Sequence, residues 1–227
     1  MEEVIEIPGM GKIKFEKLKD KNKKEKNNPI KMSKYIKTIE YEDLKKLIKN
    51  DYIMSLLKRR KKVRIYETSP INLISQYRYD VFIKYYYVKS YIENKNYALA
   101  KEIYLEHIKS FNNFLEPDGE KKGKEEFINK FNSLIINIQQ EGINKTIIPI
   151  TKNGEIIDGA HRLAIALYLN KRIRFAIFDL LDANYGKEFF IKRGFKEKYI
   201  KIIEEEVVKK RKWKNKRTQK YLLYYVE

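Results

Sequence analysis

Residues 158–162 combine side chains and backbone features that together suit phosphate. The five residues are Asp158, Gly159, Ala160, His161 and Arg162. Apolar residues precede and follow them, in a pattern that predicts a buried strand before the turn and a helix after it. The first backbone N–H groups of a helix have no partner within the helix, and they carry partial positive charge. The sequence therefore predicts an anion site at this turn.

Each residue of the turn has an expected part in that site. Gly159 permits unusual backbone dihedrals and lets a ligand come close to the backbone. The backbone of Ala160, the next residue, is expected to bind the same ligand. Arg162 offers a planar fork for phosphate oxygens, and His161 adds another donor. Asp158 has three open roles, as helix cap, as Mg²⁺ ligand and candidate catalytic group, or as the partner that holds Arg162 in place.

Arg78, Asp80 and Lys84 form a second candidate group. They stand at i, i+2 and i+6 near the start of an expected helix. Asp80 is a candidate metal ligand or general base, and Arg78 and Lys84 are candidate phosphate contacts. The same spacing is equally typical of a solvated, salt-bridged helix start.

The remaining polar candidates are weaker. His107, the only other histidine, is expected to be a packed or surface residue, and Glu116 and Asp118 stand on an expected loop. The chain has no cysteine, which excludes disulfides, cysteine-ligated zinc, iron–sulfur clusters and thiol nucleophiles.

Composition sets the outer limits on function. The formal net charge is +19, which is typical of proteins that bind nucleic acid, anionic lipid or phosphorylated substrates. However, the lysines are spread along the chain and mixed with glutamate, as the coding bias of an AT-rich genome would also produce. Nucleic acid is therefore a possible partner that the charge alone does not favour. No targeting or membrane-spanning segment is expected, so the default location is the cytoplasm.

Hydrophobic periodicity predicts an α+β chain around these candidates. Helices are expected at about 41–57, at 71–111 with a break near 94–96, at 124–140, at 160–169 and at 196–215. Strands are expected at 63–66, 146–150, 155–157 and 172–178, with a hairpin turn at Asn153-Gly154. The polar segment 1–33, with its lysine-rich run 19–28, is expected to be an exposed, mobile loop.

Residues 124–169 resemble the core of the ParB/sulfiredoxin-like superfamily. The resemblance is carried by Ser133-Leu134-Ile135 and Glu141-Gly142 in and after the helix, by Ile148-Pro149-Ile150, and by the run from Asn153 to Ala164. It implies a small mixed sheet with surrounding helices and added helical segments at both ends. It also implies that the Gly159-to-Arg162 turn binds the phosphates of a nucleotide, ATP or another, and that the segment after the first strand approaches that turn.

The superfamily's members differ in chemistry. Sulfiredoxins use a cysteine where this chain has Ala160, so that activity is excluded. Only 47 residues follow Leu180, too few for the helix-turn-helix and dimerisation domains of ParB partition proteins. The turn is most similar to the Asp-Gly-His-His-Arg turn of free-serine kinases, from which it departs at Ala160. Residues 185–206 are similar to tails of ParB-like proteins encoded among bacterial surface-polysaccharide genes.

These considerations predict an ATP- and Mg²⁺-dependent enzyme that transfers phosphate to a small hydroxyl-bearing acceptor. A non-catalytic nucleotide- or DNA-binding protein is the alternative, and a nuclease is the weakest one. The expected organisation is a basic, partly mobile N-terminal extension with one helix (1–60), a nucleotide-binding domain with a helical insertion at 71–111 (61–182), and a C-terminal helical tail (183–227).

Overall fold

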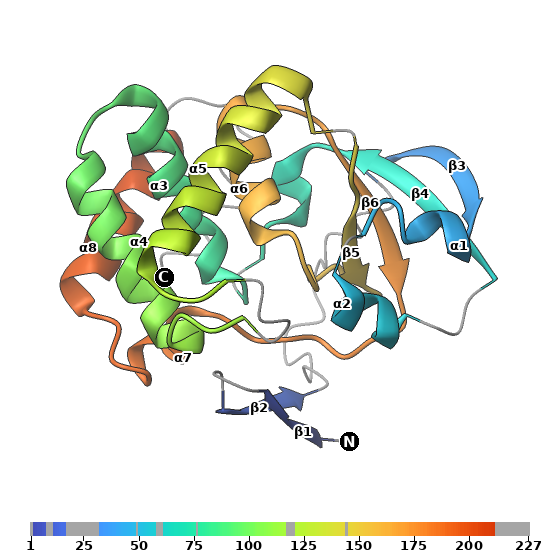
Figure 1. The fold of residues 1–227 in the computed structure, drawn as a ribbon, viewed down its shortest axis with the longest axis horizontal. Coiled ribbons are helices and arrows are strands. Elements are labelled where there is room, and N and C mark those ends of the chain that lie inside the picture. Colours follow the sequence, from blue (N-terminus) through green and yellow to red (C-terminus); the bar gives the residue numbers. More distant parts are fainter. Residues whose placement is uncertain are drawn as a thin grey trace.

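The chain forms an α+β structure, as the sequence predicts. The computed structural model describes residues 2–7, 11–16, 32–48, 50–57, 61–75, 77–116, 121–143 and 145–211. Within these ranges it contains a four-stranded mixed sheet, a two-stranded hairpin and eight α-helices (Figure 1). Most of the helices gather on one side of the sheet, in the left half of Figure 1.

The sheet has the strand order β3-β4-β6-β5. The strands are β3 (Lys34–Glu40), β4 (Lys62–Thr68), β5 (Ile148–Thr151) and β6 (Ile173–Phe178). β4 is antiparallel to both of its neighbours, whereas β5 and β6 run parallel. Parallel neighbours need a crossover, which α6 (Ala160–Leu169) provides.

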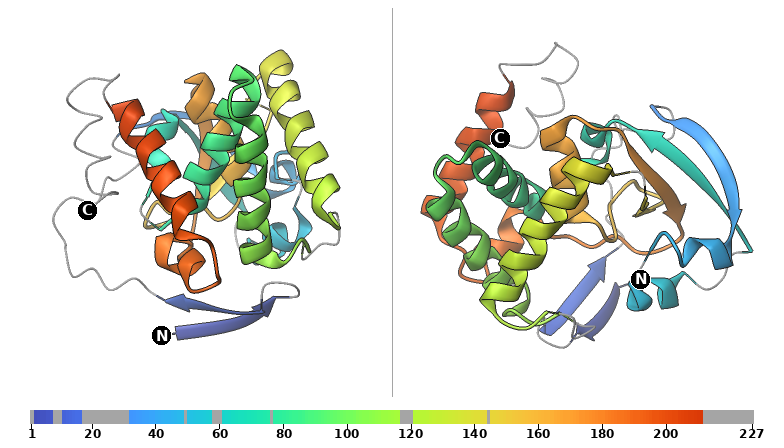
Figure 2. Two further views of the ribbon diagram at one scale, coloured as in Figure 1. Left: turned by 90° about the vertical axis from the view of Figure 1, so that its left-hand side faces the viewer. Right: turned by 45° about the horizontal axis from the view of Figure 1, so that its top comes forward.

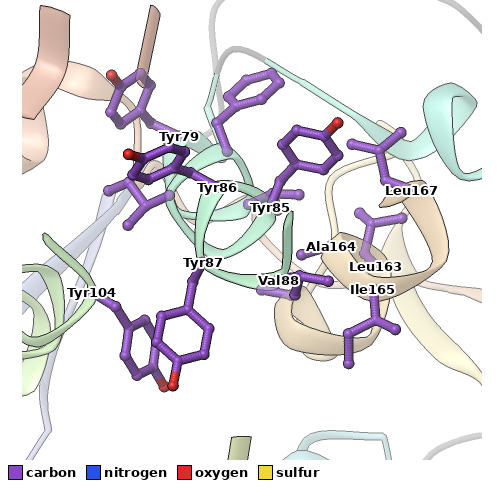
Figure 3. Packing of buried hydrophobic residues seen from close by; sticks show 14 of the residues in the cluster. Tyr79, Tyr85, Tyr86, Tyr87, Val88, Tyr104, Leu163, Ala164, Ile165 and Leu167 are labelled. Carbon is purple, nitrogen blue, oxygen red and sulfur yellow. The ribbon is translucent and has the colours of Figure 1, made fainter. Parts of the chain in front are cut away.

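Both faces of the sheet are covered by hydrophobic clusters. Successive residues of a strand point to opposite faces, so neighbouring residues of β4 contact different clusters. Ile65 of β4 belongs to a cluster built with the short helices α1 (Tyr41–Leu44) and α2 (Asp51–Leu56). The next residue, Tyr66, packs on the larger cluster, which includes α6 and α3 (Tyr79–Glu93). Figure 3 shows α3 and α6 in contact, with Val88 beside the residues Leu163 and Ala164.

A second group of helices packs around α3 and α6 (Figure 2). It comprises α4 (Tyr97–Asn112), α5 (Lys124–Glu141), α7 (Lys187–Ile191) and α8 (Glu197–Arg211), and the 3₁₀ turn η1 (Pro70–Leu73) precedes α3. The expected break inside 71–111 is confirmed. Asn94 and Asn96 adopt φ of 51° and 56° there, a conformation that asparagine tolerates well.

Several sequence predictions of secondary structure are wrong. The helical pattern expected from residue 71 becomes an α-helix only at Tyr79, where α3 begins after the 3₁₀ turn. The single helix expected at 41–57 is two helices, because Asn50 accepts a hydrogen bond from the Ile53 backbone at 2.9 Å and so starts α2 afresh. The strand expected at 155–157 is only an isolated bridge between Ile156 and Ile150.

The N-terminal region also has more structure than expected. β1 (Glu2–Ile7) and β2 (Gly11–Glu16) form an antiparallel hairpin, where a loop was predicted. β3 was not predicted either, and its hydrogen bonds to β4 make it part of the main sheet. The lysine-rich run 19–28 lies outside the described residues. The division of the chain near residues 60 and 182 stays a prediction.

No helix in the described part of the chain is long and apolar enough to span a membrane.

Candidate functional site

The predicted phosphate turn begins α6. Gly159 is the residue that precedes the helix, with φ of +93°, and no side chain caps the first turn. A Cβ atom at this position would lie 3.1 Å from Ile148 Cγ1 and 3.2 Å from Arg162 Nη2. The turn therefore requires glycine for two reasons, namely its left-handed dihedral and the close approach of β5 and Arg162. The first backbone N–H groups of a helix have no partner within the helix, and the residue before α6 supplies none from its side chain.

Arg162 folds back over this turn and pairs with Asp158. Its Nη2 donates to Asp158 Oδ2 at 2.9 Å, and its Nη1 donates to the Ile147 carbonyl at 3.4 Å. Of the three roles open to Asp158, holding Arg162 is thus the one that this structure displays, and the capping role is not realised. The side chains of Arg162 and Asp158 are 16% and 33% exposed, so both can still meet a ligand.

His161 points from the first turn of α6 toward α4. Its Nε2 lies 2.9 Å from the Tyr104 hydroxyl, and its ring packs edge-on against Phe131 at 4.5 Å between centroids. Burial, followed by the nearby positive charge of Lys84, holds the pKa of His161 well below its ordinary value. The imidazole is therefore neutral at physiological pH, and it can bind phosphate only as an uncharged donor.

The second candidate group does come together, as a buried ion cluster. Asp80 Oδ1 accepts from Arg78 Nε at 2.9 Å, and Asp80 Oδ2 accepts from Arg78 Nη2 at 3.0 Å and from Lys84 Nζ at 2.8 Å. All three residues are buried, which differs from the solvated helix start that was the alternative.

The electrostatics of the cluster limit what Asp80 can do in this arrangement. Burial alone would raise the pKa of Asp80, but the Arg78 and Lys84 cations outweigh it and hold that pKa well below its ordinary value. Burial lowers the pKa of Lys84, although Asp80 opposes that shift. Because both carboxylate oxygens already accept hydrogen bonds, Asp80 here orders two cations, and its role as metal ligand or base stays a prediction.

Arg78 links this cluster to the segment that leads into the phosphate turn. Its Nη1 donates to the carbonyl of Ile156, two residues before Asp158. Its guanidinium also stacks on the ring of Tyr185 at 5.1 Å. The start of α3 thus approaches the turn, as the family resemblance implies. The contact that we observe for Arg78 is with the backbone, so its predicted contact with phosphate stays untested.

Two further buried acids shape the tight turn that follows β5. Glu155 accepts a hydrogen bond from the hydroxyl of Ser75. Asp182 accepts from the Thr151 hydroxyl and from Asn153 Nδ2, the latter at 2.5 Å. The 151–157 segment is therefore hydrogen-bonded to Ser75, which precedes α3, and to Asp182, which follows β6. These contacts hold the backbone that leads to Gly159.

Two of the weaker candidates, His107 and Glu116, lie near Tyr104. His107 is fully buried, as a packed histidine should be, yet neither ring nitrogen has a hydrogen-bond partner among the described residues. Burial and the Lys84 charge lower its pKa well below the ordinary value. Glu116 pairs with Lys121 at 2.8 Å. Asp118 lies outside the described residues.

The number and exposure of the acidic side chains at the site determine how Mg²⁺ could bind there. No group of three or more potential metal ligands occurs in the part of the chain that the structure describes. Mg²⁺ usually keeps several waters and takes only one or two protein carboxylates together with substrate phosphates. The partly exposed Asp158 at the uncapped start of α6 fits that pattern, and it would serve beside bound phosphates.

Sequence reasoning missed the residues that support the turn. Tyr104 stands in an aromatic helical pattern that predicts core packing, and nothing in the sequence separates it from its neighbours. Glu155 and Asp182 are separated by 27 positions in the sequence. Only the parallel pairing of β5 with β6 brings their surroundings together.

The chain has no match among protein-family models, curated proteins or solved structures.

Proposed function

We propose that the chain binds a nucleotide at the Asp158-to-Arg162 turn and transfers phosphate from ATP to a small hydroxyl-bearing acceptor. The proposal extends the resemblance of residues 124–169 to the ParB/sulfiredoxin-like superfamily, and within it to the turn of the free-serine kinases.

One observation carries the binding part of the proposal. The first turn of α6 has no side-chain cap, and Arg162 lies against Gly159. Two N–H groups of Arg162 donate to Asp158 and to the Ile147 carbonyl. A guanidinium has five N–H donors, so several remain for phosphate oxygens. An uncapped helix start beside a prepositioned guanidinium is a favourable arrangement for binding phosphate.

The transfer part of the proposal uses the same residues. Phosphoryl transfer depends on positioning and on stabilising the negative charge of the transferring group. Arg162 and the α6 backbone would supply positive potential at that group, and neutral His161 would supply a further donor. Asp158 would contribute a carboxylate to Mg²⁺ or take up the acceptor proton. Lys84 lies close enough to lower the pKa of His161, and so it adds to the positive potential nearby.

Surface-polysaccharide metabolism is one setting for such an enzyme. Residues 185–206 support it through their similarity to tails of ParB-like proteins in that context. In this chain they form α7 and most of α8.

A thermal-shift panel tests nucleotide choice. The purified chain is measured with ATP, ADP, CTP and GTP, each with and without Mg²⁺, and we expect a saturable rise in melting temperature with ATP. A larger rise with CTP would redirect the proposal from ATP to another nucleotide. No rise with any nucleotide would remove the kinase reading.

Asp158→Asn tests transfer. This variant should abolish transfer of the ATP γ-phosphate to hydroxyl compounds while circular dichroism shows an unchanged fold, because the amide loses the charge that Mg²⁺ or the acceptor proton needs. Unchanged turnover in Asp158→Asn would contradict the role of this carboxylate.

A non-catalytic nucleotide-binding protein is the second candidate, and a specific observation favours it. The buried acids beside the turn are all engaged, Asp80 by two cations, Glu155 by Ser75, and Asp182 by hydrogen bonds. Such a protein would bind ATP and return it intact in the presence of every acceptor. If it also binds DNA through its lysines, that affinity would fall steeply with salt.

A further inference from the structure

Tyr104 and His161 form a partly buried hydrogen bond whose donor can be worked out. Tyr104 is 1% exposed, and the hydrogen bond that the structure gives its hydroxyl is the one to His161 Nε2, at 2.9 Å. A phenol has a single proton to donate. If Nε2 carried the imidazole proton, it would donate to the Tyr104 oxygen. The hydroxyl proton of Tyr104 would then be buried without this acceptor, at a cost in stability.

The favoured arrangement is therefore the reverse one. Tyr104 donates to an unprotonated Nε2, which places the imidazole proton on Nδ1. Nδ1 is bonded to Cγ, so it is the ring nitrogen nearer to the first turn of α6. In this tautomer the N–H of His161 lies on the ring nitrogen nearer to the His161 backbone.

Aromatic rings pack against this imidazole, and its surroundings keep it neutral. Phe131 packs edge-on against it at 4.5 Å, and the Tyr104 ring lies edge-on at 5.9 Å. Burial disfavours the imidazolium, and Lys84 from α3 adds to that effect. The other charged or titratable groups that act on His161 from neighbouring elements are Lys121 and His107, which also disfavour protonation, and Asp80, which favours it.

We propose that Tyr104 is a positioning residue that holds His161 as a neutral, Nδ1-protonated imidazole, and that this N–H contributes a hydrogen bond to the bound phosphate. The ligand half of this inference rests on the proposed function, whereas the tautomer does not.

The chain offers a clean spectroscopic test, because it contains only two histidines. Long-range ¹H–¹⁵N spectra of the full chain, labelled with ¹⁵N-histidine, report which nitrogen carries the proton at pH 7. A His107→Phe variant assigns the two rings. We expect a protonated Nδ1 and a free Nε2 for His161, and we expect Tyr104→Phe to abolish that preference.

Tyr87→Phe is the matched control. Tyr87 is a fully buried neighbour of Tyr104, with ring centroids 4.9 Å apart, but its hydroxyl bonds Asn132 and Tyr97. Figure 3 shows the Tyr87 and Tyr104 rings side by side. Both variants lose one buried hydroxyl, and only Tyr104→Phe should change the His161 spectrum.

Calorimetric titration of ATP with Mg²⁺ supplies the second readout. We expect Tyr104→Phe to bind about two- to tenfold more weakly than wild type, the range for one lost hydrogen bond, and Tyr87→Phe to bind as wild type does. A proton on Nε2 in wild type, or an unchanged tautomer in Tyr104→Phe, would overturn the inference. Equal ATP affinity in Tyr104→Phe would overturn its ligand half. If wild type binds no ATP, the ligand half falls with the proposed function, and the spectra still decide the tautomer.

Discussion

Asp80→Asn should be among the most destabilising single substitutions in the protein. Asp80 is 1% exposed, and its two oxygens accept three hydrogen bonds, at 2.8, 2.9 and 3.0 Å. The donors are Arg78 and Lys84, each of which is 4% exposed. Asparagine keeps the size and removes the charge, which leaves two cations buried beside a neutral amide. Breaking a buried ion pair in this way costs about 3–5 kcal/mol. For a chain of this size that cost lowers the melting temperature by about 6–20 °C.

A second substitution separates charge imbalance from lost packing. Lys84→Met keeps most of the side-chain volume and leaves the two-pronged Arg78–Asp80 contact intact, so it should cost much less than Asp80→Asn. The double variant Asp80→Asn/Lys84→Met should be more stable than Asp80→Asn alone, because it contains one unpaired buried cation rather than two. The two substitutions should therefore be non-additive by at least about 1 kcal/mol.

Urea denaturation at pH 7, followed by circular dichroism, measures these free energies of unfolding. The reasoning would be refuted if Asp80→Asn lost less than about 1 kcal/mol, the value typical of an exposed pair. Strict additivity in the double variant would refute it as well, because it would mean that Lys84 and Asp80 do not act on each other.

Two further outcomes follow from the same geometry. Gly159→Ala should lower stability by more than the roughly 1–2 kcal/mol of a left-handed residue, since its Cβ meets Ile148 and Arg162. Gly194→Ala is the control, because its φ of +82° is similar and a Cβ there meets nothing within 4 Å, so equal losses in the two variants would contradict the crowding. His107→Phe concerns pH. The lowered pKa of this histidine means that the unfolded chain takes up a proton first, so stability present above about pH 6.5 falls as the pH drops. His107→Phe should remove up to about 1.4 kcal/mol per pH unit of that fall. The measurement is the unfolding free energy as a function of pH between about 6.5 and 4.5, and the same slope in wild type and variant would count against a buried neutral His107.

The elements with strong local signals could be predicted from the sequence. The helix 160–169 and the strand 172–178 have continuous apolar patterns, and the structure has α6 and β6 within one residue of those bounds. The break near 94–96 was also predictable, because asparagine favours the left-handed conformation found there.

The elements that depend on tertiary contacts could not be predicted. β3 has a mostly exposed, mixed pattern, and its strand conformation comes from pairing with β4. The 155–157 segment has the composition of a strand, but it forms only one isolated bridge with β5. The side chains of Ser75 and Arg78, from distant parts of the sequence, also make hydrogen bonds to this segment.

The residues of the candidate site also differ in how far the sequence predicts them. The Asp158-to-Arg162 turn could be found because its residues are adjacent, and the Asp80 group because one helix start carries all three members. Tyr104 could not be found, since 57 positions separate it from His161 and an aromatic residue on a helix usually indicates core.

The central claim is that Arg162 and the start of α6 bind the phosphates of a nucleotide. Isothermal titration of ATP with Mg²⁺ into wild type, Arg162→Ala and Arg172→Ala tests it most directly. Arg172 is the control because its side chain is 53% exposed and pairs with Glu67 of β4. Arg172 directly precedes β6, the strand that pairs with β4. We predict that Arg162→Ala binds about 10- to 100-fold more weakly, the loss expected for one or two charge-assisted hydrogen bonds, while Arg172→Ala binds as wild type does. Equal weakening by both variants would mean that general positive charge attracts the nucleotide, and unchanged binding in Arg162→Ala would contradict the claim.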